Sequence, residues 1–143
     1  MSYNATNSYS TMQKGGLSGR ELEASVLSRA GIMLKKVQDN WNDPDRDAKL
    51  TEAILFNQKV WSYFQAELID PENPLPKNLR EDILSLSIFI ERRLYEIMAY
   101  PDSAKISIVI DINFNLAAGL RSKPEEAPSA TPPSDYAPFT LKN

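Results

Sequence analysis

The fold is decided by residues 50–76, LTEAILFNQKVWSYFQAELIDPENPLP, where a long apolar pattern runs into a proline-rich stop. One apolar row recurs every four or three residues, which places its members on one face of an α-helix: Leu50, Ile54, Asn57, Trp61, Phe64 and Leu68. Ala53, Phe56 and Val60 form a second row beside it. A helix that is apolar on two rows has neighbours on more than one side.

The end of this helix is set by the three prolines at 71, 74 and 76. Each lacks a backbone N–H and disfavours the helical conformation of the residue before it. We therefore expect a central helix over 45–68, followed by a stiff, extended connector. Such a helix needs partners, and the rest of the chain must supply them.

Two further segments carry helical apolar rows, and we expect them to pack against the central helix. The row of the first, over 19–41, is Leu22, Val26, Ala30, Leu34, Val37 and Trp41. The row of the second, over 77–99, is Leu79, Ile83, Leu86, Ile90, Leu94 and Ile97. Ser18 and Glu21 fit a capping box at the start of the first helix. Asp43 is expected to cap the central helix, with Pro44 as its first residue.

The segment 104–120 has two readable patterns. Strict alternation of apolar residues from Ile106 to Leu116 is typical of a strand, while the same residues also fit a helix. Three helices would leave a single strand without a pairing partner, and an unpaired strand is not stable. We therefore predict a helix, capped by Asp102 or Ser103. The sequence thus predicts an all-α bundle of about four helices, near 19–41, 45–68, 77–99 and 104–120.

The two ends of the chain differ from this body in composition. Residues 1–16 are rich in Ser, Asn and Tyr, and residues 122–143 hold five of the ten prolines. We expect a flexible N-terminal segment over 1–16, a helical domain over 17–121 and a disordered Pro-rich tail over 122–143. Within that tail, Tyr136, Phe139 and Leu141 either make a short docking motif or belong to an untethered end.

Composition excludes several functions. The 143 residues contain no cysteine and no histidine, which removes thiol chemistry, disulfides, Ser–His–Asp catalysis and Cys/His zinc sites. No carboxylates are spaced as a catalytic pair or a metal site, so we expect no enzyme, no cofactor and no metal. The formal charge is −3, and 17–121 carry 13 Lys/Arg against 16 Asp/Glu. Direct binding of nucleic acid is therefore not expected.

Membrane insertion is not expected either. No run of about 18 apolar residues is present, and the polar segment MSYNATNSYSTMQK at 1–14 has no apolar core of the kind found in secretion signals. We expect a cytoplasmic protein.

The candidate functional residues are aromatic or amide side chains. One aromatic set either forms a partner-binding groove or belongs to the core: Trp41, Phe56, Trp61, Tyr63 and Phe64. Tyr63 falls off the main row, so it is the best candidate for an exposed anchor. Asn57 and Asn113 each interrupt an apolar row. Because an unpaired buried amide costs about 1–3 kcal/mol, they either satisfy backbone groups or each other and fix the helix register, or face a groove and bind a partner's backbone.

The connector and the last helix supply the other candidates. The connector either presents an extended edge with Leu75 as a knob or sets the angle between two helices. The complete set of candidate partner-binding residues is Asn57, Trp61, Tyr63, Phe64, Asn73, Pro74, Leu75, Pro76, Ile112, Asn113 and Leu116.

Four blocks, in this order and spacing, resemble the FlaF family of alphaproteobacterial flagellar proteins: RELE at 20–23, LFNQKVW at 55–61, NPLP at 73–76 and IDINFNLAAGL at 110–120. The resemblance covers roughly 18–121. It implies a small helical cytoplasmic protein that is needed for flagellin production and acts on flagellin as a regulator or secretion chaperone. FlbT is the usual counterpart of this family in controlling flagellin synthesis.

We therefore expect a non-enzymatic protein that binds flagellin. Flagellin ends are amphipathic helices, and a helical bundle with a spare apolar groove can cover such a helix. The anchors would come from Trp61, Phe64, Leu75, Ile112 and Leu116. The alternatives are a regulator of flagellin translation that acts through a protein such as FlbT, and a helical scaffold or dimerisation module. The sequence does not specify an oligomeric state.

Overall fold

The computed structural model of the protein describes residues 19–122, which form four helices and, within that range, no strand. They are α2 (Gly19–Asp39), α3 (Arg46–Ile69), α4 (Lys77–Ala99) and α5 (Ser103–Arg121). The predicted all-α bundle is confirmed, and the segment with the two patterns is a helix. The predicted flexible ends, 1–16 and most of 122–143, lie outside the described residues, as does the predicted cap at Ser18.

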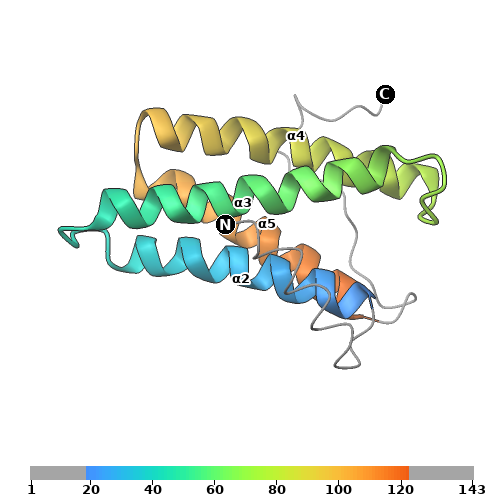
Figure 1. The fold of residues 1–143 in the computed structure, drawn as a ribbon, viewed down its shortest axis with the longest axis horizontal. Helices are drawn as coiled ribbons and strands as arrows, with labels where there is room; N and C mark the ends of the chain where they lie inside the picture. Colours follow the sequence, from blue (N-terminus) through green and yellow to red (C-terminus); the bar gives the residue numbers. More distant parts are fainter. Residues whose placement is uncertain (1–18, 123–143) are drawn as a thin grey trace.

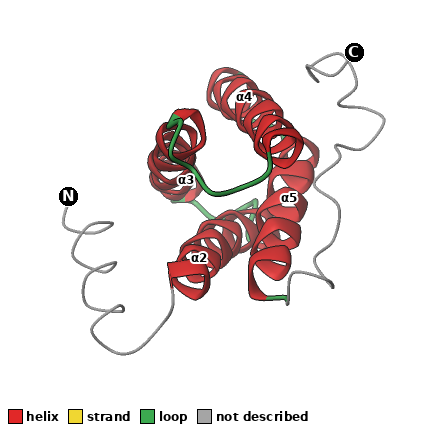
Figure 2. Cartoon of the chain, turned by 90° about the vertical axis from the view of Figure 1, so that its right-hand side faces the viewer, coloured by secondary structure: helices red, strands yellow, loops and turns green. Residues whose placement is uncertain are grey.

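The four helices run alternately up and down, and short connections join them at the ends of the bundle (Figure 1). Viewed along the bundle, they surround a common interior (Figure 2). The most extensive contact between helices is that of α2 with α5, where Gly31 leaves room for the ring of Phe114. A Cβ added at Gly31 would lie 3.0 Å from the ring of Phe114. By contrast, α4 touches α5 only sparsely.

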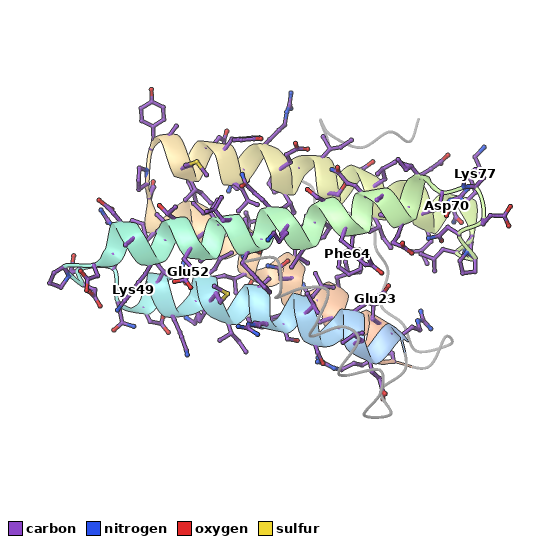
Figure 3. All side chains as sticks on the ribbon, in the orientation of Figure 1. Glu23, Lys49, Glu52, Phe64, Asp70 and Lys77 are labelled. Atoms are coloured by element: carbon purple, nitrogen blue, oxygen red, sulfur yellow. The ribbon has the colours of Figure 1, made fainter. Side chains whose placement is uncertain are left out.

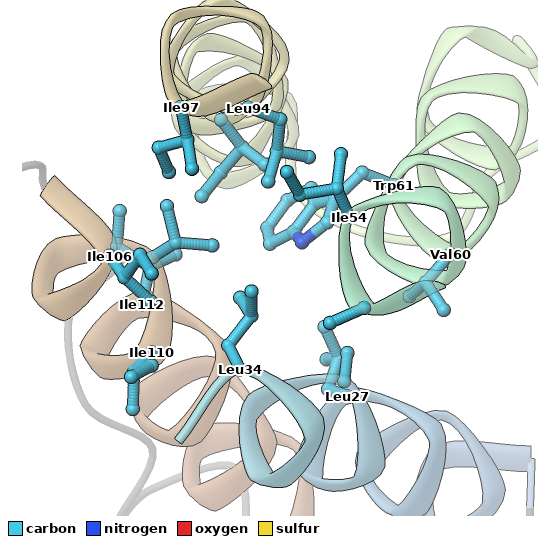
Figure 4. Close-up of a cluster of buried hydrophobic side chains, with 14 of the residues drawn as sticks. Leu27, Leu34, Ile54, Val60, Trp61, Leu94, Ile97, Ile106, Ile110 and Ile112 are labelled. Atoms are coloured by element: carbon cyan, nitrogen blue, oxygen red, sulfur yellow. The ribbon is translucent and has the colours of Figure 1, made fainter. Parts of the chain in front are cut away.

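The interior consists of the predicted apolar rows. Trp61 projects from α3 into the centre, and Ile54, Leu94, Ile97 and Ile106 of three helices belong to the same cluster (Figure 4). In α5 the buried positions follow helical spacing rather than alternation: Ile106, Val109, Ile110, Ile112, Asn113 and Ala117. Contact with α2 along its length therefore selects the helix over the strand pattern.

The predicted cap of α3 is wrong. The helix begins at Arg46 with Asp45 as its N-cap residue, two positions after Asp43. Asp43 instead uses its Oδ1 to accept the backbone N–H of Asp45 at 2.7 Å, and its carbonyl accepts the N–H of Arg46 at 2.9 Å. Both bonds build a turn that contains Pro44. The side chain of Asp43 therefore stabilises the turn before the helix.

Two other helix ends can be compared with the sequence. The first predicted helix extends to Trp41, but α2 ends at Asp39, and Trp41 lies in the turn, where the guanidinium of Arg46 stacks 4.2 Å above its ring. Of the two predicted caps of α5, the structure has Asp102, which accepts the N–H of Ala104 at 2.9 Å, while Ser103 is the first residue of the helix.

Among the described residues, α5 alone has the length and apolar composition of a membrane span, with a mean hydropathy of 1.2 over 18 residues. A core helix of a folded bundle meets the same two criteria, and α5 packs along α2 with Asn113 in its buried face. The absence of a membrane-spanning segment therefore remains a prediction.

Candidate functional site

The two predicted asparagines form one buried polar network with Trp61. Asn113 donates from Nδ2 to Oδ1 of Asn57 at 2.7 Å, and its own Oδ1 accepts the indole N–H of Trp61 at 2.8 Å. Asn57 donates in turn to the carbonyls of Ala30 and Ala53, at 3.1 and 2.9 Å. Both asparagines are 0% exposed. The amides therefore satisfy each other and the backbone, which is the register-fixing alternative.

Several other predicted anchors belong to the core. Phe64 and Ile112 are buried, and Leu116 packs against the buried cluster. With Trp61 only 2% exposed, none of the three buried side chains is open to a partner in this conformation. A partner contact through them would require α3 and α5 to separate. Binding through these residues therefore remains an untested prediction.

The connector after α3 is tied to the helix that it follows. Asn73 donates from Nδ2 to the carbonyl of Glu67 at 2.8 Å, and its Oδ1 accepts the N–H of Leu75 at 2.9 Å. Pro76 is the N-cap residue of α4. Leu75 is partly buried, while Pro74 is exposed. The connector thus turns the chain from α3 into α4, and its prolines are exposed to solvent together with Asp70 and Glu72.

Tyr63 is the predicted anchor that remains accessible. Its side chain is 41% exposed, and its ring meets the edge of Phe64 with centroids 5.7 Å apart. It lies off the buried row of α3, as its position in the helical pattern predicts.

An exposed apolar surface on α3 and α4 was missed by the sequence reasoning. We call it the α3–α4 seam and define it by Leu55, Ile69, Ile88, Tyr95 and Met98, which are 54%, 67%, 37%, 58% and 42% exposed. In α4, three of these lie at i, i+7 and i+10, which is one face of a helix. The signal was present in the sequence as apolar residues left over once the core row of α4 had been assigned.

One side-chain contact shows how the two helices of the seam are aligned. Gln65 of α3 donates to Oε1 of Glu91 of α4 at 3.4 Å. Since α3 and α4 are antiparallel, this register brings Ile69 level with Ile88 and places Tyr95 further along α4. The seam therefore runs lengthwise, with a polar pair near its middle.

A cleft of about 530 Å³ opens at the α2–α3 turn. It is lined by Met33, Lys36, Val37, Asn40, Asp43, Arg46, Lys49, Glu52 and Ala53. Hydrogen bonds from the backbone N–H of Asp45 and from the side chain of Lys49 hold the pKa of the Asp43 carboxyl below its usual value. The hydrogen bond to Asp43 in turn raises the pKa of Lys49. The residues of 19–122 contain no group of three or more His, Cys, Asp or Glu side chains that could hold a metal. The cleft is therefore lined by side chains of both charges at the turn between α2 and α3.

One carboxylate lies in an unfavourable place. Glu23 of α2 is partly buried on the side that faces α3 (Figure 3). Burial raises the pKa of its carboxyl, the charge of Glu67 raises it further, and Arg20 offsets part of the effect. This isolated acid has no catalytic neighbour of the His or Cys type, since the chain contains neither residue.

Comparison with known proteins identifies the family. A profile of the family described as flagellar protein FlaF matches residues 5–120. The chain belongs to the FlaF family. No curated protein and no solved structure matches it significantly. The FlaF match includes all of α2, α3 and α4, nearly all of α5, and every residue of the buried network and of the seam. These features therefore belong to a flagellar protein.

Proposed function

We propose that this FlaF-family protein is a non-enzymatic, cytoplasmic flagellin-binding protein that acts as a secretion chaperone in flagellum biogenesis. The observation that carries the proposal is the α3–α4 seam, a set of large apolar side chains left open on a bundle in which the predicted anchors Trp61, Phe64 and Ile112 are buried. Membership of the FlaF family supplies the flagellar context. The seam supplies a surface for a partner.

The spacing of the seam residues suits a helical partner. Grooves between two helices bind amphipathic helices through anchors one and two turns apart. Ile88 and Tyr95 are two turns apart on α4, and Ile69 of α3 is level with Ile88. An amphipathic end of monomeric flagellin could therefore lay its apolar face here, which would keep it from assembling early. The charged side chains around the seam would remain in solvent.

The test uses the full chain and purified monomeric flagellin, with binding followed by co-elution and calorimetry. The double variant Ile88→Gln/Tyr95→Gln removes two anchors while keeping good helix formers at both positions. The matched control is Ile32→Gln, which removes a comparably exposed aliphatic residue from α2. We expect the double variant to weaken binding about tenfold or more, because anchors at an interface centre each contribute above 1 kcal/mol, and the control to bind as wild type.

Two results would overturn the proposal. One is wild-type affinity in a folded double variant, and the other is a wild-type chain that does not bind flagellin. Tyr63→Ala is included as a third variant, because loss of binding there instead would move the site to the α2 side of α3. Helical circular dichroism of each variant separates lost contact from lost fold. A wild-type chain that binds FlbT but not flagellin would favour the regulatory alternative.

A further inference from the structure

The chain continues beyond the part that matches the family. The FlaF profile ends at residue 120, and 21 residues follow Ser122. From 123 to 135 the sequence KPEEAPSATPPSD has no apolar residues other than alanine and proline. Residues 136–141, YAPFTL, then bring together Tyr136, Phe139 and Leu141. A polar, proline-rich spacer thus carries one compact apolar segment.

We propose that the segment 136–141 docks on the α3–α4 seam of its own chain and competes there with flagellin. The competition rests on the proposed function, whereas the docking itself does not. The bundle leaves five large apolar side chains open in the seam, and the spacer leads from α5 to a segment with three large apolar side chains. Lys142 follows the segment directly, and Glu91 lies within the seam, so the two carry opposite charges.

The spacer is long enough to reach. The C-terminal end of α5 lies at the same end of the bundle as the α3–α4 connector, near which the seam begins at Ile69 (Figure 1). Tyr136 is 14 positions after Ser122, which corresponds to a mean span of about 20 Å for a flexible chain and about 43 Å for a polyproline helix. With 23 residues, α4 is about 34 Å long. The extended span exceeds the length of α4, and we expect the segment to reach first the end of the seam nearest the connector, at Ile69 and Ile88.

Because the segment 136–141 is tethered to the bundle, even a weak contact is enough for it to occupy the seam. A short flexible linker gives its attached segment an effective concentration in the millimolar range, so a contact with a dissociation constant of about 1 mM is already half occupied. A second copy of the chain at micromolar concentration has no such advantage. If the tail covers the seam for between half and nine-tenths of the time, the apparent dissociation constant for flagellin rises about two- to tenfold.

The docking is tested on the full chain without flagellin. Backbone amide chemical shifts are compared between wild type and the variant Tyr136→Ser/Phe139→Ser/Leu141→Ser, at two protein concentrations. We expect shift changes at seam residues of α3 and α4, none around Ile32, and the same pattern at both concentrations. Ala127→Ser/Ala130→Ser in the spacer is the matched control. In an Ile88→Gln/Tyr95→Gln background, the tail variant is expected to leave the seam unchanged.

Changes confined to the tail, or centred on another surface, would overturn the docking. Changes that grow with concentration would assign the contact to a second copy and overturn it as well. Flagellin titration of the same tail variant is then expected to give two- to tenfold tighter binding than wild type. Equal affinities with proven docking would overturn the competition. If neither chain binds flagellin, the proposed function fails, while the shift comparison still decides the docking.

Discussion

The side-chain amide of Asn113 donates a 2.7 Å hydrogen bond to Asn57 inside the bundle. The two asparagines are 56 positions apart in the sequence, and their bond joins α5 to α3. Neither side chain is exposed. The same network reaches α2 through the carbonyl of Ala30 and holds the indole of Trp61. Three of the four helices are therefore aligned by one set of buried hydrogen bonds, and only one register of α5 against α3 satisfies them.

Removing one member of this network should be costly. Asn113→Ala leaves the N–H of Trp61 and the Oδ1 of Asn57 without their present partner in a dry interior. Since each orphaned buried group costs about 1–3 kcal/mol, we expect the free energy of unfolding to fall by about 2–4 kcal/mol. Urea unfolding followed by helical circular dichroism measures it.

The matched control is Asn115→Ala, two residues along the same helix at an exposed position. Its effect is expected to stay within about 0.5 kcal/mol, as for other surface substitutions. Equal losses in the two variants would show that the network does not stabilise the fold.

The helical body was predictable because each apolar row is a local pattern, and three to four turns of it specify which face is buried. The pairing of Asn57 with Asn113 was left as one of two alternatives, because spacing along one helix does not reveal the register between two. The α3–α4 seam was missed for a related reason. Ile88 looks like an ordinary surface residue until the neighbouring helix places Ile69 level with it.

The start of α3 could not be read from the sequence either. Asp43 suits two local structures, a helix cap and a turn closed on the N–H of Asp45. The position of Trp41 under Arg46 belongs to the turn, and that tertiary contact is invisible to a capping rule. At α5 the sequence offered Asp102 or Ser103 as the cap, and the structure has Asp102.

The two aspartates should therefore respond differently to substitution. Asp102→Ala removes the side-chain cap of α5, which typically costs about 1 kcal/mol of stability. Asp111→Ala, at an exposed position within the same helix, is the control and is expected to be near neutral. Thermal and urea unfolding measure both. A control as destabilised as Asp102→Ala would show that the loss is not due to the cap.

The effect of replacing Gly31 on stability should be set by its contact with α5 rather than by the helix propensity of the new residue. In a helix, Gly→Ala normally gains about 1 kcal/mol, but a Cβ here lies 3.0 Å from the Phe114 ring. We expect Gly31→Ala to give no gain in the wild-type chain and to approach the normal gain in a Phe114→Leu background, where the ring is absent. A double-mutant cycle by urea unfolding measures the coupling. The same gain in both backgrounds would refute the close contact.

Glu23 should make stability depend on pH in a defined direction. Burial, with the charge of Glu67, raises its pKa above the ordinary 4.5 in the folded chain. Between 4.5 and that raised value the folded state binds more protons than the unfolded state, so the contribution of this group to stability falls as pH rises through the window. Glu23→Gln removes the charge, and its melting temperature is expected to exceed that of wild type at pH 7.

Below pH 4.5 this advantage should disappear, because Glu23 is then protonated in both states and resembles glutamine. Melting curves from pH 3 to pH 8 test the sign. The matched background is Glu67→Gln, where one cause of the raised pKa is gone and the gain from Glu23→Gln is expected to be smaller. An advantage that is constant over the whole range would mean that the substitution acts through packing on α3 and not through the buried charge.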